Sequence, residues 1–273
     1  MRTTWALILF LLPSLAFAQR VHEARELTGA CAEFEVGGSA FAWQDTALEA
    51  GGTRVVVRAH EELEVVGLPK TRTRHGEAVR ICSGQSLLVR RSGVQGALPL
   101  ESLALAWAPA GRDDRLLLGR GPSPRTFELR LVDRAGRRIA ATALQPGLTS
   151  MGDGDDEYTP GLQWLGDMGF AATDGVALAR FEYHACGYNN PVIPVIVAGG
   201  RMVVGPEADR VSEAGVFHAD TQLLFPSAPG GIDQGLVLRT VVETFDESSS
   251  TYVADSVESH AWRFDGARFV KQP

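Results

Sequence analysis

Residues 126–132 (TFELRLV), the turn 133–136 (DRAG) and residues 138–144 (RIAATAL) decide the fold class of this chain. Apolar and polar side chains alternate in the first segment, as they do in a β-strand with one buried face. Gly136 accepts the positive φ of a tight turn, and Asp133 caps that turn. The two segments are therefore predicted to pair as an antiparallel hairpin.

The same rhythm of a short alternating run closed by Gly, Asp or Pro recurs after Cys31. It predicts strands at residues 31–36, 53–59, 62–66, 78–82, 86–90, 126–132, 138–144, 176–184, 192–197, 201–204, 221–225, 236–244 and 259–264. Helical spacing is rare, and its best candidate is the brief segment 45–50. Parallel α/β folds need crossover helices. The sequence therefore predicts an all-β chain and excludes dinucleotide-binding folds.

The first eighteen residues have the three parts of a secretory signal. Arg2 is followed by an apolar run, residues 5–15, and then by Ala16-Phe17-Ala18 before the expected cleavage site. The run is too short to remain as a membrane helix, and no later segment approaches the ~20 apolar residues that a span requires. We expect a mature chain that begins near Gln19, has no transmembrane span and is secreted or periplasmic.

Composition predicts a folded, two-domain protein. Hydrophobic residues make up 45% of the chain and charged residues 22%, as in ordinary globular proteins. The segment 107–111 (WAPAG) is interpreted as an interdomain connection, because Pro and Gly interrupt strand pairing. This divides the mature chain into residues 19–108 and 109–273.

The distribution of charge argues against a nucleic-acid partner. Residues 151–273 carry 7 basic and 18 acidic side chains, and an acidic surface repels phosphate backbones. The basic patch at 70–75 (KTRTRH) has no interleaved aromatic residue on which a base could stack, so it is interpreted as a solvated loop or hairpin tip.

Three cysteines are present, and an exported chain is expected to pair two of them. Cys31 and Cys82 fall in the same predicted domain, so the disulfide is assigned to them. Closing a loop of ~50 residues would stabilise the fold by ~4 kcal/mol in the chain-entropy model. Cys186 is left as a buried, unreactive thiol on a strand.

The N-terminal half resembles a bacterial SH3-like domain. The resemblance lies in residues 47–57 (ALEAGGTRVVV), 62–66 (ELEVV), 86–90 (SLLVR) and 96–103 (GALPLESL). It implies a small β-barrel with a groove for a peptide or for cell wall; a spacer that carries the second domain is the alternative. The chain departs from the family's closing pattern at Ala97, where the family has an aromatic residue that supports the groove.

The C-terminal half resembles a degenerate FG-GAP or VCBS-type β-hairpin repeat, on residues 164–167 (WLGD) and 173–178 (TDGVAL). In that family an Asp-rich loop at this place binds calcium, which takes six to eight oxygen ligands. No carboxylate lies between Asp167 and Asp174, so other ligands must come from an earlier acidic loop. The candidate calcium ligands are Asp153, Asp155, Glu157, Asp167 and Asp174.

Catalytic signatures are absent from the sequence. There is no Gly-x-Ser-x-Gly elbow, and the six histidines (22, 60, 75, 184, 218 and 260) form no His-Glu-x-x-His pair. The chain is therefore predicted not to be an enzyme and to need no cofactor. One alternative is a hydrolase that uses a carboxylate pair, or Cys186 with His184, His218 or His260.

The last hairpin, residues 262–270 (WRFDGARFV), places aromatic residues around an Asp-Gly turn and is predicted to close the sheet. A glycan-stacking platform made by Trp262 and Phe264 is the alternative. Together these features predict an exported, non-catalytic binding protein of the bacterial cell envelope, with a cell-wall polymer, glycan or protein as its ligand. A calcium-binding extracellular module and a hydrolase are the two alternatives.

Overall fold

A computed structural model describes residues 30–69, 74–75, 78–123, 125–148, 158–183 and 187–273. The predicted signal segment 1–18, the acidic loop residues Asp153, Asp155 and Glu157, and Cys186 lie outside these ranges. The all-β prediction is confirmed: the described residues form strands, with one 3-10 turn at Leu100–Ser102. Within these ranges, no helix has the length and apolar character needed to cross a membrane.

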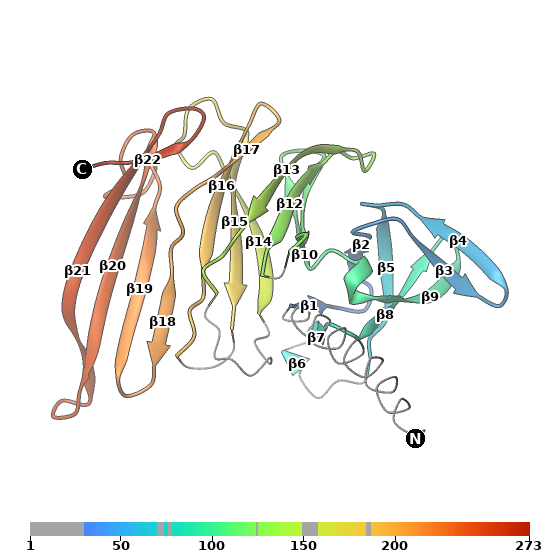
Figure 1. Cartoon of the computed structure of the whole chain (residues 1–273), viewed down its shortest axis with the longest axis horizontal. Helices are drawn as coiled ribbons and strands as arrows, with labels where there is room; N and C mark the ends of the chain where they lie inside the picture. Colours follow the sequence, from blue (N-terminus) through green and yellow to red (C-terminus); the bar gives the residue numbers. More distant parts are fainter. Residues whose placement is uncertain (1–29, 70–73, 76–77, 124, 149–157, 184–186) are drawn as a thin grey trace, which may run out of the picture.

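The N-terminal body is a curled arrangement of short antiparallel strands (Figure 1). Its main sheet has the order β2-β5-β8-β9, and β3 lies along β9 with β4 as its hairpin partner. A small sheet, β1-β7-β6, stands beside it. The bounds are β1 Cys31–Phe34, β2 Ser39–Phe41, β3 Thr46–Ala50, β4 Thr53–Val57, β5 Glu62–Gly67, β6 Arg74–His75, β7 Ala78–Cys82, β8 Ser86–Arg91 and β9 Val94–Pro99.

The best helical candidate, the segment 45–50, is not a helix, because Thr46–Ala50 form β3. Gly51 and Gly52 both have positive φ, 55° and 82°, and turn the chain sharply back on itself. Leu48 then faces Val55 across the β3–β4 hairpin and is fully buried. Cross-strand pairing and burial override the weak helical spacing of this short segment.

The segment expected to connect two domains is also a strand. β10 (Ala106–Ala110) pairs with β11, so the boundary expected after Ala108 falls inside a sheet. Its alternation buries Ala108 and Ala110 and leaves Trp107 and Pro109 facing outward. Pro109 is accommodated because β10 is a sheet edge, where a missing N–H costs little.

Two four-stranded sheets form a central sandwich. Their orders are β10-β11-β12-β13 and β14-β15-β16-β17, and the edges approach each other, β10 beside β14 and β13 beside β17. Phe127 and Phe181 pack between them with ring centroids 4.6 Å apart. The bounds are β11 Asp114–Arg120, β12 Phe127–Val132, β13 Arg138–Leu144, β14 Thr159–Gly166, β15 Gly175–Glu182, β16 Val192–Ala198 and β17 Arg201–Val204.

A third sheet, β18-β19-β20-β21-β22, covers the other face of β15 and β16 (Figure 1). Along β15, Ala177 and Phe181 face the sandwich core, whereas Val176 and Leu178 face the third sheet. A strand covered on both faces reads as a continuous apolar run, as residues 175–179 of β15 do. The bounds are β18 Arg210–Glu213, β19 Phe217–Leu224, β20 Gly235–Asp246, β21 Thr251–Phe264 and β22 Phe269–Lys271.

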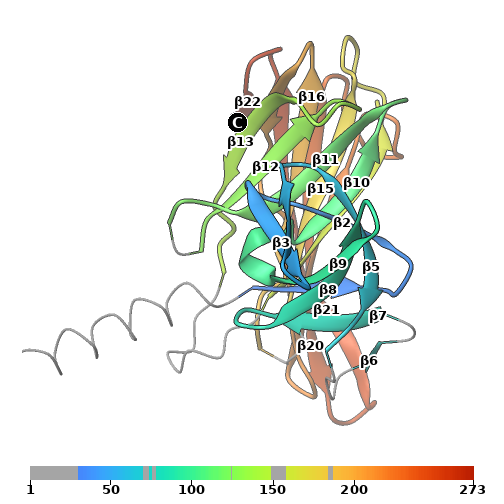
Figure 2. The same cartoon turned by 90° about the vertical axis from the view of Figure 1, so that its right-hand side faces the viewer.

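The N-terminal body and the sandwich share one hydrophobic core. A single cluster of buried residues includes Leu48 and Leu63 of the body together with Leu116 and Phe181 of the sandwich. Figure 2, seen from the side of the N-terminal body, shows the strands of the sandwich directly behind it. The joint between them is therefore a packed interface rather than a linker.

Several local predictions are confirmed. Cys31 and Cys82 lie opposite each other in the β1–β7 pair and form the disulfide. Asp133 and Gly136 make the turn between β12 and β13, and β21 and β22 form the terminal hairpin. Phe264 is 7% exposed and belongs to the core between the second and third sheets. The alternative of an exposed platform made by Trp262 and Phe264 is therefore wrong.

Candidate functional site

The two described candidate calcium ligands hold backbone amides. The Asp167 carboxylate accepts a hydrogen bond from the Gly169 N–H (3.0 Å), and that of Asp174 accepts one from the Gly199 N–H (2.8 Å). No group of three potential metal-ligating side chains occurs among the described residues. The other three candidates, Asp153, Asp155 and Glu157, lie outside these residues, so the calcium site stays a prediction.

The histidines proposed for hydrolysis are separated. His218 packs on Tyr252, with ring centroids 5.6 Å apart, and lies opposite Glu243 of β20. His260 lies opposite Leu238 of β20. Because positions 238 and 243 point to opposite faces of a strand, the two imidazoles lie on opposite faces of the third sheet. Cys186 and His184 are outside the described residues, so the hydrolase alternative stays untested.

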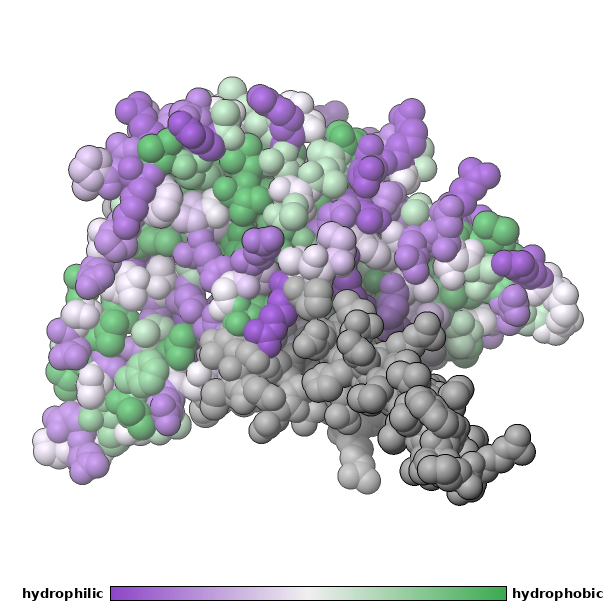
Figure 3. Space-filling view, in the orientation of Figure 1, coloured by the Kyte–Doolittle hydropathy of each residue, from purple (hydrophilic) through white to green (hydrophobic). Residues whose placement is uncertain are grey.

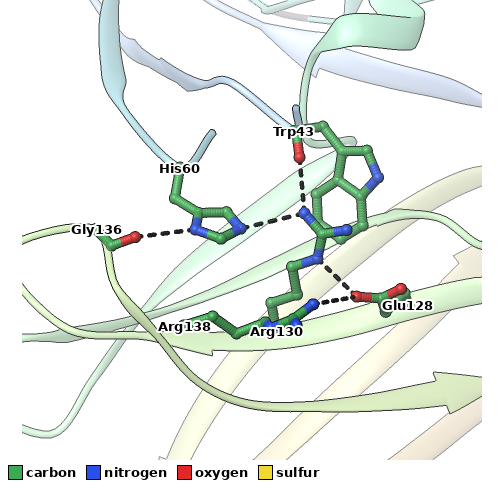
Figure 4. Close-up of polar contacts among 6 residues, drawn as sticks. All are labelled: Trp43, His60, Glu128, Arg130, Gly136 and Arg138. Carbon is green, nitrogen blue, oxygen red and sulfur yellow. Dashed lines mark hydrogen bonds and ion pairs between the residues drawn. The ribbon is translucent and has the colours of Figure 1, made fainter. Parts of the chain in front are cut away.

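The most connected polar cluster joins the N-terminal body to the sandwich (Figure 4). The guanidinium of Arg130, on β12, lies 3.6 Å from the ring centroid of Trp43 and donates to the Trp43 carbonyl oxygen (2.7 Å). The same Nη1 donates to His60 Nε2 (3.1 Å), and Nε donates to Glu128 (2.7 Å). Arg130 thus contacts two segments of the N-terminal body at once.

The contacts of His60 define its protonation state. Because a guanidinium only donates, His60 Nε2 must accept, and the proton lies on Nδ1, which donates to the Gly136 carbonyl oxygen (3.0 Å). Burial lowers the pKa of His60, and the nearby charges of Arg130 and Arg138 lower it further, against the hydrogen bond to Gly136. Both nitrogens of this neutral imidazole are occupied, so His60 links the N-terminal body to Arg130 and to the β12–β13 turn.

The sequence analysis missed this cluster. Its members come from the β2–β3 and β4–β5 connections and from the β12–β13 hairpin, which no motif unites. The only local signal is the alternation around Arg130, which places its side chain opposite the buried Leu129 and Leu131.

The second candidate site is an open strand edge on the third sheet. Strand β22 pairs with β21 only at Trp262, Arg263 and Phe264. Among the described residues, the rest of this side of β21 has no partner strand, and every residue from Thr251 to His260 is exposed. In Figure 1 this part of β20 and β21 projects beyond the neighbouring sheet.

The open edge carries unpaired main-chain groups. The Ala261 carbonyl oxygen accepts a hydrogen bond from the Gln272 N–H, so the main-chain groups of Ala261 point away from β20. Because these groups alternate sides along a strand, those of Ser259 and Val257 also point to the open side. They can form a ladder with an added strand.

The side chains of this edge are a mixture of apolar and acidic groups. Tyr252 is 37% exposed, Val253 52% and Val257 53%. Residues 240–259 contain five acidic side chains and no basic one. Figure 3 shows hydrophobic and hydrophilic residues side by side at this projecting end. A partner would therefore meet apolar contacts, free main-chain groups and negative charge together.

Comparisons of the chain with protein-family models, with curated proteins and with solved structures found no match.

Proposed function

We propose that this chain is an exported, non-catalytic binding protein of the bacterial cell envelope that binds an extended, basic segment of a partner protein along the edge of β21. The observation that carries the proposal is the open edge itself. Strand addition uses main-chain hydrogen bonds for affinity and alternate side chains for specificity. Val257 and Ser259 offer the main-chain groups, and Tyr252 and Val253 offer exposed apolar surface beside them.

Charge determines which partner fits. Asp255 and Glu258 lie on the edge strand, with Asp246 and Glu247 at the tip of the hairpin. Two such edges would repel each other, and like charges opposite one another weaken a strand pair. The register also shifts between Val242 and Glu243, and such a bulge further discourages pairing between copies. A segment that alternates Lys or Arg with β-branched residues would pair with the main-chain groups of the edge and place its positive charges near the acidic side chains.

The cell-envelope assignment rests on the sequence. The signal-like segment 1–18 supports export, and the disulfide between Cys31 and Cys82 is typical of proteins that fold in oxidising compartments. The resemblance of residues 47–103 to bacterial SH3-like domains supports a role in binding at the cell wall or at envelope proteins. Cell fractionation with N-terminal sequencing tests export, and a cytoplasmic protein that retains Met1 would contradict it.

The binding test uses a defined probe. A synthetic strand-length peptide that alternates Lys with Val and Thr is added to the mature protein, and amide hydrogen exchange is followed by NMR. We expect exchange at Val257 and Ser259 to slow as the peptide binds. A peptide of the same pattern with Glu in place of Lys should leave exchange unchanged.

Two substitutions at one position separate main-chain pairing from side-chain contact. Val257→Pro removes an N–H that faces the open edge and should abolish protection at Ser259, whereas Val257→Thr keeps the N–H and should preserve it. Spectra of the free variants check that each is folded. Equal binding of the basic peptide to folded Val257→Pro and Val257→Thr, or equal binding of both peptides, would refute the proposal.

A further inference from the structure

An open hollow at the other end of β21, away from the hairpin tip, is bordered by turns from the second and third sheets. Ala171 and Ala172 come from the β14–β15 connection, Gly199 from the β16–β17 turn, and Gly266 from the β21–β22 turn. The remaining lining residues are Ala198, Arg201, Gln234, Arg263, Phe264 and Asp265. None of these residues belongs to the open edge or to the Arg130 cluster.

Hydrogen bonds fix the turns around this hollow. The side-chain oxygen of Gln234 accepts a hydrogen bond from the Ala171 N–H (3.2 Å). The main-chain carbonyl oxygen of Gln234 accepts one from the Phe264 N–H (2.7 Å). The Asp174 carboxylate holds the Gly199 N–H on the opposite side. Gln234 therefore links the β14–β15 connection to the end of β21, and these hydrogen bonds hold the walls of the hollow in place.

The hollow has an excess of positive charge. Within the described part of the chain, the guanidinium groups of Arg201 and Arg263 have no hydrogen-bond or ion-pair partner. The Asp265 carboxylate is already engaged, because it accepts from the Ala267 and Arg268 N–H groups (2.9 Å each) and lies 3.6 Å from the Arg268 guanidinium. The backbone hydrogen bonds lower the pKa of Asp265, which keeps this carboxylate ionised and committed to its own turn.

This charge contrasts with its surroundings. Residues 151–273 carry 7 basic side chains against 18 acidic ones. Arg201 of β17 and Arg263 of β21 both line this hollow, and Arg268 lies in the adjoining β21–β22 turn. The apolar side chains of Ala171, Ala198 and Phe264 line the same hollow. A ligand here meets guanidinium groups and apolar surface together.

We propose that this hollow binds a small organic carboxylate, with the carboxylate on Arg201 and Arg263 and the apolar body against Phe264 and the alanines. A guanidinium presents paired N–H donors that match the two oxygens of a carboxylate. The apolar lining favours an organic anion over a hydrated inorganic one, since burial of an apolar body adds to the affinity. This site is independent of the proposed strand binding, because it uses neither Val257 nor Ser259.

The experiment is an NMR titration of the mature protein with hexanoate, and with inorganic phosphate as the comparison. We expect saturable shifts of the Gly199 and Gly266 amides with hexanoate at concentrations up to about 10 mM, in the range of weak small-ligand binding. Arg201→Gln and Arg263→Gln should each weaken hexanoate binding about tenfold, as expected for the loss of one charged hydrogen-bonding partner.

Arg239→Gln is the matched control, because Arg239 is an exposed arginine of the same sheet that does not line the hollow. It should bind hexanoate as the unaltered protein does. Absence of saturable shifts, equal weakening by Arg239→Gln, or phosphate binding as tight as that of hexanoate would each overturn the proposal. Retained protection of Val257 by the basic peptide in Arg201→Gln would show that the strand edge stands separately.

Discussion

The indole of Trp43 lies directly against Gly119 of β11. A Cβ at Gly119 would fall 2.3 Å from the Trp43 ring, and the Arg130 guanidinium lies 3.6 Å from the ring centroid. Trp43 is 6% exposed and belongs to a small cluster with Phe41, Ala104, Leu117 and Val132. The indole therefore packs against β11 and Arg130 and joins the N-terminal body to the outer face of the sandwich.

Gly119→Ala should destabilise the protein by about 1–3 kcal/mol, because the added methyl group overpacks this site and displaces the indole. Urea unfolding followed by Trp fluorescence measures the change. Gly161→Ala is the control: Gly161 also lies in a strand, but a Cβ there meets nothing within 4 Å. Unfolding of both variants at the same urea concentration would show that the Trp43 indole does not need the space at Gly119.

Acid should loosen this joint through His60. Burial lowers the pKa of His60 in the folded state below its ordinary value, so the folded state binds fewer protons than the unfolded chain. The stabilisation of the fold by neutral His60 is complete above the pKa of this histidine in the unfolded chain. It is lost as the pH falls below about 6.5. A proton on Nε2 would also face the guanidinium of Arg130, which needs this atom as an acceptor.

The measurement compares the free energy of unfolding at pH 7.5 and pH 5.5, on either side of the ordinary His pKa of about 6.5, for the unaltered protein and for His60→Asn. Asn is chosen because His60 has a φ of 66°, which Asn tolerates better than most residues. We expect the unaltered protein to lose more stability on acidification than His60→Asn. An equal loss in both would exclude His60 as the titrating group.

Removal of the disulfide between Cys31 and Cys82 should lower the free energy of unfolding by about 2–4 kcal/mol. The two residues are separated by 51 positions, so the bond removes much of the freedom of the unfolded chain. Cys31→Ala combined with Cys82→Ala is compared with reduced, unaltered protein, which keeps the sulfur atoms but not the bond. Equal stability of the oxidised and reduced proteins would contradict this expectation.

Asp133→Ala should lower the melting temperature by weakening the β12–β13 turn. The Asp133 carboxylate accepts from the Ala135 and Arg137 N–H groups (2.9 Å each), and these hydrogen bonds, with the contact to Arg137, lower its pKa. The contribution of the ionised Asp133 carboxylate to stability is present above the ordinary Asp pKa. It is lost as the pH falls through the lowered pKa of Asp133 in the folded state. Asp113→Ala, which removes only a 3.8 Å ion pair with Arg134, should change the melting temperature less.

Local patterns predicted the strands well because alternation and turn chemistry act over a few residues. The hairpin around Asp133 and Gly136 is confirmed on this basis. The disulfide between Cys31 and Cys82, predicted because both fall in one predicted domain of an exported chain, is also confirmed. The interpretation of 107–111 as a connection is wrong, and the helical spacing of 45–50 is misleading, because tertiary pairing decides the state of a short segment with weak local preference. Pro109 shows this directly. A proline would interrupt a central strand, but Pro109 fits β10 because β10 is the edge of its sheet.

The candidate sites could not be predicted in the same way. Arg130, Trp43 and His60 meet only after the sheets have packed, and no sequence spacing records that meeting. The open edge was equally hidden, because alternation shows which face of β21 is buried but not which side is left unpaired. The hollow needs four separate turns, and Arg201 and Arg263 stand far apart in sequence.

The contact between β1 and Tyr158 has a consequence for the order of assembly. The Cys31 N–H donates to the Tyr158 carbonyl oxygen (3.0 Å), and Ala30 forms a parallel bridge with Tyr158. The first described strand therefore cannot complete its pairing until the middle of the polypeptide has been synthesised and brought back to it. Such topologies with distant partners close slowly, on the order of milliseconds to seconds. We therefore expect the N-terminal body of this protein to fold more slowly than one built from neighbouring contacts.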